Sequence, residues 1–266
     1  MSTSQADIIG EGPIRVTVLH GILGSGRNWR TFCRRLSRQR PDLSLHLPDL
    51  RNHGHAPKAL PPHTLASCVE DLAGEGRADV VIGHSFGGKV ALRWAQTHPG
   101  DLAQIIVLDA PPGASAAHGD DSALSVIQAL RAVPVPAVDR ESVRSSLLSA
   151  GLSPAIASWL LTSLRREAPD GEWTWVYNVD GVEQMIRDYF AADFWPWLAS
   201  LRGPPTVDVV RAQNSDRWTP ADRHRLATLE AEGRLRVHEL TDAGHWLHVD
   251  NPAGLLSLLE TIIHRR

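Results

Sequence analysis

The sequence is poor in cysteine, has no long apolar run and carries no excess of basic charge. Its two cysteines, Cys33 and Cys68, are too few for a disulfide scaffold and do not have the spacing of a zinc site. No run of about 18 apolar residues occurs, so no membrane span is predicted. The 30 acidic residues outnumber the 27 basic ones, and this net charge of -3 argues against a nucleic-acid-binding protein.

The chain composition is that of a globular protein with a substantial core. Its length of 266 residues, 42% of them hydrophobic, fits one large α/β domain or two small ones. Residues 1–14 are polar and lack the apolar centre of a secretory signal peptide. We therefore expect a soluble protein of the cytoplasm.

Short β-branched runs alternate with helical patterns along much of the chain. This alternation predicts the α/β class, with a mostly parallel central sheet flanked by helices. The predicted strands are residues 15–20, 43–50, 79–83, 104–109, 206–210 and 235–240. The predicted helices are residues 28–39 with Asn28 as N-cap, 63–74, a helix that ends near Pro99, and 253–264.

The alternation stops between Pro111 and Pro205, where no clear strand occurs and helices are predicted at residues 122–131, 141–148 and 154–165. We interpret residues 113–204 as a helical cap, inserted into a core formed by residues 1–112 and 205–266. Such a cap would cover the carboxyl edge of the sheet, where open α/β sheets bind ligands.

The cap segment is rich in tryptophan, with five of the nine in the chain. Because ligand sites favour apolar clefts between layers, we predict that some of these side chains line a substrate pocket. Packing of the same rings into a second core is the alternative. The residues predicted to bind substrate are Trp159, Trp195 and Trp197.

The motif most informative about function is Gly83-His84-Ser85-Phe86-Gly87, a G-x-S-x-G pattern. An apolar strand precedes it and an amphipathic helix follows, as a sharp strand-to-helix turn that exposes a nucleophilic serine requires. We predict Ser85 as the nucleophile. Lys89 in the following helix is predicted to be solvated, or to reach solvent with its charged end.

A serine nucleophile needs a general base, and His245 is the predicted one. It lies in Asp242-Ala243-Gly244-His245-Trp246, just after the last predicted strand, at the edge of the sheet where Ser85 is expected. His248 and His84 are interpreted as structural residues.

Two aspartates are candidates for the acid that orients the base. Asp109 ends the strand after the serine motif, whereas Asp216 follows the next-to-last strand. We favour Asp109 and keep Asp216 as the alternative.

The tetrahedral intermediate of acyl transfer needs two N–H donors for its oxyanion. One is predicted to be the amide of Phe86, directly after the nucleophile, and the other the amide of Ile22 in the loop after the first predicted strand. The glycines of that loop match neither phosphate-binding pattern, so nucleotide binding is not expected.

These motifs resemble those of α/β-hydrolase-fold serine esterases. More narrowly, the chain resembles the bacterial short-chain esterase and acyl-CoA thioesterase group related to the mitochondrial α/β-hydrolase-domain protein. The segments that carry the resemblance are HGILGS (20–25), DLRNHGHA (49–56), GHSFGGK (83–89), LDAPP (108–112) and AGHWLH (243–248). The resemblance implies the α/β-hydrolase fold, Ser85 and His245 as nucleophile and base, and Asp109 as acid. In that group a serine tends to occupy the usual acid position, and here that position is Ser215.

The leading functional hypothesis is hydrolysis of a small-molecule carboxylic ester or thioester through an acyl-enzyme, without metal or organic cofactor. The same residues could instead support C–C or lactone hydrolysis or cofactor-free peroxidation, because function depends on the pocket as well as the fold. A non-catalytic small-molecule receptor or interaction protein is the alternative from another class. The sequence does not indicate an oligomeric state.

Overall fold

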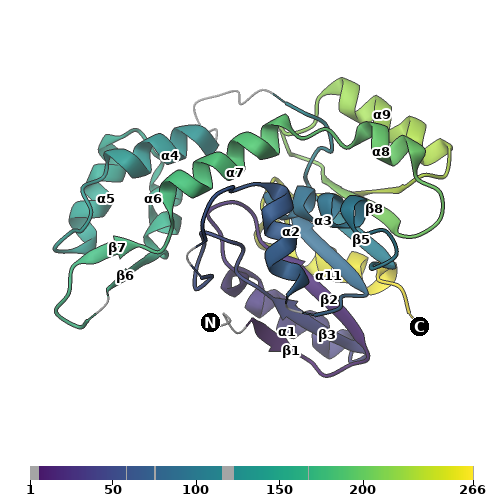
Figure 1. Cartoon of the computed structure of the whole chain (residues 1–266), viewed down its shortest axis with the longest axis horizontal. Helices are drawn as coiled ribbons and strands as arrows, with labels where there is room; N and C mark the ends of the chain where they lie inside the picture. Colours follow the sequence, from purple (N-terminus) through teal and green to yellow (C-terminus); the bar gives the residue numbers. More distant parts are fainter. Residues whose placement is uncertain (1–5, 58, 75, 116–122, 167, 266) are drawn as a thin grey trace.

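The computed structural model describes residues 6–57, 59–74, 76–115, 123–166 and 168–265. Within them one sheet runs in the order β1-β3-β2-β4-β5-β8-β9, as Figure 1 shows in part. All neighbours pair in parallel except β1 and β3. The strands are β1 (Asp7–Ile9), β2 (Ile14–Leu19), β3 (Leu43–Leu47), β4 (Val80–His84), β5 (Gln104–Leu108), β8 (Thr206–Ala212) and β9 (Arg236–Leu240).

Helices cover both faces of this sheet, because the strands are apolar on both sides. In β4, Val81 packs on one face, and Val80 and Ile82 pack on the other. The face of Val81 is covered by α2 (Leu65–Ala73), α3 (Phe86–Thr97), α8 (Trp195–Ser200) and α9 (Pro220–Ala231). The opposite face is covered by α1 (Arg30–Gln39) and α11 (Pro252–Ile262). The predicted α/β class and α/β-hydrolase arrangement are confirmed.

Local details differ from the prediction at the amino-terminal side. The antiparallel edge strand β1 was not predicted, because three residues are too short for a clear alternation. Asn28 is not an N-cap: it lies inside the short helix η1 (Gly26–Trp29), whose N-cap is Ser25. Its side-chain oxygen instead accepts a hydrogen bond from the Ser25 amide at 2.7 Å.

The segment between β5 and β8 forms a lobe beside the sheet (Figure 1). It contains α4 (Ala123–Ala132), α5 (Arg140–Ser149), α6 (Pro154–Leu161), α7 (Val179–Ala191) and a small antiparallel pair, β6 (Leu164–Arg166) and β7 (Trp173–Trp175). The prediction missed β6, β7 and α7, and it extended α6 beyond its end at Leu161. Ser122, the first residue of the helix predicted over residues 122–131, lies outside the described residues. The cap limits 113 and 204 stay a prediction.

This lobe has its own apolar cluster, which also includes residues of the loop after β2. Leu23, in the loop after β2, packs among the lobe residues, and its carbonyl accepts a hydrogen bond from the Tyr177 hydroxyl at 2.5 Å. Ile22 contacts both this cluster and the sheet cluster. The loop predicted to hold an oxyanion donor therefore lies between the two bodies of the molecule.

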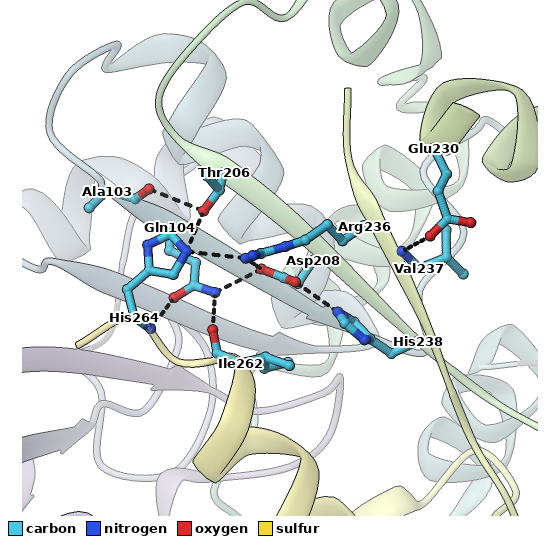
Figure 2. A network of polar contacts seen from close by, with 10 residues as sticks. All are labelled: Ala103, Gln104, Thr206, Asp208, Glu230, Arg236, Val237, His238, Ile262 and His264. Carbon is cyan, nitrogen blue, oxygen red and sulfur yellow. Dashed lines mark hydrogen bonds and ion pairs between the residues drawn. The ribbon is translucent and has the colours of Figure 1, made fainter. Parts of the chain in front are cut away.

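A polar network fixes the carboxyl-terminal segment to the sheet, as Figure 2 shows. Asp208 of β8 is fully buried and accepts hydrogen bonds from Gln104, Arg236 and His238 at 2.6–2.8 Å. Gln104 also binds the Ile262 carbonyl and the His264 amide. Both carboxylate oxygens of Asp208 therefore accept hydrogen bonds, as a buried carboxylate requires.

Within the described part of the chain, none of the helices combines the length and apolar composition needed to cross a bilayer.

Candidate active site

The serine motif forms a strained turn between β4 and α3. Ser85 has a φ of 52° and a ψ of -114°, outside the comfortable region for a residue with a side chain. The turn requires glycine on both sides: a Cβ on Gly83 would lie 2.1 Å from the Gly87 carbonyl oxygen, and one on Gly87 would lie 2.6 Å from the Leu19 carbonyl oxygen. The close approach of strand and helix thus explains the spacing of this motif.

Ser85, His245 and Asp109 meet at the carboxyl edge of the sheet. His245 Nε2 is 3.1 Å from Ser85 Oγ, and His245 Nδ1 is 2.8 Å from Asp109 Oδ2. Ser85 follows β4, Asp109 follows β5, and His245 lies in the loop after β9, so each residue comes from the carboxyl end of a different strand. The structure brings together the three residues that the sequence predicted.

Asp109 is fully buried and surrounded by donors. Its Oδ2 accepts from Ser215 Oγ at 2.6 Å, while Oδ1 accepts from Trp218 Nε1 at 2.7 Å and the Ala212 amide at 3.1 Å. Burial raises the pKa of Asp109, but the hydrogen bonds from His245, Ser215 and Trp218 outweigh it and hold the pKa below its usual value. The carboxylate therefore stays ionised and held in place beside His245.

The alternative acid is placed elsewhere. The Asp216 side chain is 87% exposed and lies 3.4 Å from the guanidinium of Arg217. It takes part in no described contact with His245, so the structure does not bring it into the site. The hydrogen bond of Trp218 to Asp109 was not foreseen, and no sequence pattern marked this tryptophan.

Two buried histidines hold the loop that carries Ile22. His53 Nε2 accepts from the Leu23 amide, and His20 Nε2 accepts from the Leu50 amide, both at 2.9 Å. Burial lowers the pKa of His53 to about 3, so its ring stays neutral and can accept. Among the described residues, the amides of Ile22 and Phe86 make no hydrogen bond that would prevent them from donating to a ligand.

The chain matches the family model described as the alpha/beta hydrolase family over residues 18–258. It belongs to the alpha/beta hydrolase family.

Curated relatives and solved structures agree with this assignment. The chain is 28% identical over 255 residues to the sn-1-specific diacylglycerol lipase ABHD11 of Danio rerio, covering 92% of this chain and 77% of the relative. It is 27% identical over 277 residues to an esterase of Mycobacterium tuberculosis, covering 95% and 83%. A marine microorganism esterase of known structure aligns with a TM-score of 0.80 and 25% identity over 95% of this chain and 96% of its own. The resemblance predicted from the motifs is confirmed, and a serine-type hydrolase of the esterase or lipase kind is supported.

His84, the residue before Ser85, holds the loop that carries His245. His84 Nε2 donates to the His245 carbonyl oxygen at 2.8 Å, and the two rings lie 4.9 Å apart. His248 stacks on Trp29 with ring centroids 4.2 Å apart. Burial holds the pKa of His84 well below its ordinary value and lowers that of His248 to about 4. Neither ring therefore adds a positive charge beside His245 at neutral pH.

The predicted substrate-binding tryptophans occupy different environments. Trp159 of α6 meets Trp246, the neighbour of His245, edge to face at 5.1 Å, and Trp246 is 40% exposed. Trp195 is buried in the sheet cluster, where a Cβ on Gly113 would lie 2.4 Å from its Nε1, and its packing favours a structural role. Trp197 packs at the margin of the same cluster.

Lys89 contradicts its predicted exposure. Its side chain is 1% exposed, and its ammonium donates to main-chain carbonyls of residues far along the chain. No sequence pattern indicates this burial, because the partners are carbonyl groups that any residue type supplies.

No group of three or more histidine, cysteine, aspartate or glutamate side chains able to hold a metal ion occurs among the residues that the structure describes.

Proposed function

We propose that this hydrolase cleaves carboxylic esters or thioesters through an acyl-enzyme on Ser85. The observation that carries the proposal is the unbroken chain of contacts from Ser85 through His245 to the buried Asp109. A hydroxyl activated by a base that is itself oriented by a carboxylate is the arrangement that nucleophilic acyl transfer requires.

Each of the three side chains has one task in the proposed reaction. His245 Nε2 takes the proton of Ser85 as the oxygen attacks the acyl carbonyl, and then gives it to the departing alcohol or thiol. A water molecule then attacks the acyl-serine with the same base, which releases the carboxylic acid and restores Ser85. Asp109 keeps His245 in the tautomer with Nδ1 protonated and stabilises the imidazolium that forms in both steps.

The amides of Ile22 and Phe86 are the proposed donors to the tetrahedral oxyanion. Phe86 is the first residue of α3, so its N–H lies at a helix amino terminus, where the dipole favours negative charge. The His53 hydrogen bond to Leu23 supports this proposal, because it fixes the backbone directly after Ile22.

Aromatic side chains near His245 support an apolar acyl group. Trp159 and Trp246 form a continuous aromatic surface between the lobe and the catalytic loop, and we propose that it contacts the acyl chain. Trp197 remains a proposed contributor to the same pocket, whereas the burial of Trp195 argues against it. The diacylglycerol specificity named for one relative makes acylglycerol esters a sensible member of the test set.

The test is hydrolysis of a p-nitrophenyl ester series from acetate to palmitate, together with a diacylglycerol and matching S-acyl thioesters. Ser85→Ala is expected to lower kcat/KM by about a millionfold, because nucleophile and base act as a unit. Ser44→Ala is the matched control: Ser44 lies on β3, and its hydroxyl contacts His46 at 3.5 Å, away from Ser85, so its loss is expected to leave activity unchanged.

The outcome of this series separates the alternatives. Serine-dependent turnover with an optimum in acyl length supports the proposal, and the ester-to-thioester ratio identifies the leaving group. Wild-type turnover that survives Ser85→Ala contradicts it. Labelling of Ser85 by a fluorophosphonate without turnover of any ester or thioester would favour C–C or lactone substrates, or a receptor, instead.

A further inference from the structure

One buried ammonium has no part in the reaction proposed above. Lys89 lies one turn after Ser85 in α3, and its Nζ donates to the carbonyl oxygens of Gly113 at 2.7 Å, Tyr189 at 2.7 Å and Ala192 at 3.0 Å. An ammonium has three N–H donors, so these carbonyls satisfy all of them. Transfer of a charged ammonium from water to the protein interior costs free energy, whereas burial of an apolar side chain does not. The presence of a lysine at this buried position therefore needs an explanation.

The three carbonyls belong to the two ends of the lobe. Gly113 lies where the chain leaves the sheet domain, and Tyr189 and Ala192 lie at the end of α7, where it returns. The two connections also run side by side, since the Ser115 amide donates to the Phe190 carbonyl and the Phe194 amide to the Pro112 carbonyl, both at 2.9 Å. Lys89 therefore fastens both connections to the helix that begins at the nucleophile.

The same lysine contacts an aromatic side chain that packs on Phe86, the residue directly after Ser85. The Tyr189 ring centroid lies 4.4 Å from Lys89 Nζ and 6.0 Å from the Phe86 ring. Burial raises the pKa of Tyr189 to about 12, and an interaction with the Ser85 hydroxyl opposes this rise. The Tyr189 hydroxyl thus stays protonated at neutral pH, and the Tyr189 ring lies against Phe86, the residue directly after Ser85.

Acidic groups around the lysine preserve its charge. Burial lowers the pKa of Lys89, and Asp193, Asp222 and Asp188 raise it, which leaves a value of about 8. Asp188 is itself tied to the sheet domain, because it accepts a hydrogen bond from the Leu65 amide at 2.7 Å. The ammonium is therefore the dominant form at neutral pH.

We propose that Lys89 is a positioning residue for this hydrolase: by holding both connections of the lobe on α3, it keeps the Tyr189 ring packed on Phe86, the residue directly after Ser85. The inference rests on the proposed function, since it assigns a role in turnover at the same serine. It predicts that loss of the ammonium displaces the end of α7 and misaligns the site without removing any residue of the Ser85–His245–Asp109 set.

The test uses Lys89→Met, Tyr189→Leu and the double variant. Methionine keeps much of the length of Lys89 and removes its charge, and leucine removes the Tyr189 ring that contacts Lys89 and Phe86 while keeping an apolar side chain. Arg40→Met is the matched control: Arg40 is equally buried and its guanidinium also binds main-chain carbonyls, those of Glu260 and Ile263, but on the side of α11. Each rate is divided by the fraction of sites that a fluorophosphonate titrates.

Lys89→Met is expected to lower kcat per titrated site about tenfold to a hundredfold, with a smaller change in KM, as for a displaced catalytic geometry. Arg40→Met is expected to lower stability and leave kcat per titrated site unchanged. If Lys89 acts through Tyr189, the double variant loses no more than the worse single variant, because the two losses are coupled.

Amide hydrogen exchange supplies a readout that does not need turnover. Lys89→Met is expected to speed exchange in residues 113–115 and 186–194, with no such change in Arg40→Met. Unchanged exchange there, an unchanged kcat per titrated site or multiplicative losses in the double variant would overturn the proposal. Absence of Ser85-dependent turnover in the wild type would instead overturn the proposed function, and the exchange experiment would still test the attachment.

Discussion

At the scale of single residues, the site depends on how completely one carboxylate is enclosed. Asp109 accepts four hydrogen bonds, from His245, Ser215, Trp218 and the Ala212 amide. His245 is likewise fixed from both sides, because His84 holds its carbonyl while Asp109 holds its ring. This double attachment leaves the imidazole few orientations other than the one that faces Ser85.

The choice of acid gives a direct prediction at this scale. Asp109→Asn is expected to lower kcat/KM by about ten-thousandfold, because an amide no longer favours the productive tautomer and cannot stabilise the imidazolium. Asp216→Asn, a change of the same type on an exposed side chain, is expected to leave kcat/KM within about twofold. Steady-state kinetics on one ester substrate decide between them. A large loss of kcat/KM in Asp216→Asn, together with an active Asp109→Asn, would identify Asp216 as the acid instead.

At the scale of elements, the sequence predicted what local patterns determine. The apolar runs that became β4, β5 and β8 are buried on both faces, and the glycines of the serine motif are required by the close approach of β4 and α3. From these features the order of Ser85, Asp109 and His245 along the sheet edge could be derived.

The elements that escaped prediction depend on distant partners. Helix α7 carries charged residues between its buried positions Val182, Met185 and Ile186, and its end is fixed by Lys89, about one hundred residues earlier in the chain. The burial of Lys89, the role of Trp218 and the placement of Tyr189 each arise from contacts across the fold. No local pattern in a single sequence encodes such contacts.

At the scale of the whole molecule, buried histidines make stability depend on pH. Burial lowers the pKa values of His20, His53, His84 and His248. As the pH falls below about 6.5, these side chains gain protons in the unfolded chain but not in the folded one, so the free energy of unfolding decreases. Their contribution is fully present above that pH. The lowered pKa values of Asp109 and Asp208 add a second loss at more acidic pH, because their contribution disappears when they become protonated.

We predict a marked loss of stability between pH 7.5 and pH 5, measured by urea unfolding. Each histidine that stays neutral in the folded protein is expected to contribute about 2 kcal/mol to this loss. His248→Phe keeps an aromatic ring for stacking on Trp29 and removes one titrating group, so its loss is expected to be smaller by about that amount. Equal stability at both pH values would show that these rings do not stay neutral.

The cytoplasmic location remains a prediction of the sequence alone.

The central claim is that Ser85 carries the acyl group, and rapid-quench mass spectrometry tests it most directly. Mixed with a p-nitrophenyl ester and quenched in acid within milliseconds, the protein is expected to gain the mass of one acyl group, on the peptide that contains Ser85. The gain is expected to vanish in Ser85→Ala and to persist in Ser44→Ala. An acyl group found on another residue would contradict the account. So would a burst of p-nitrophenol release without any covalent adduct on the protein.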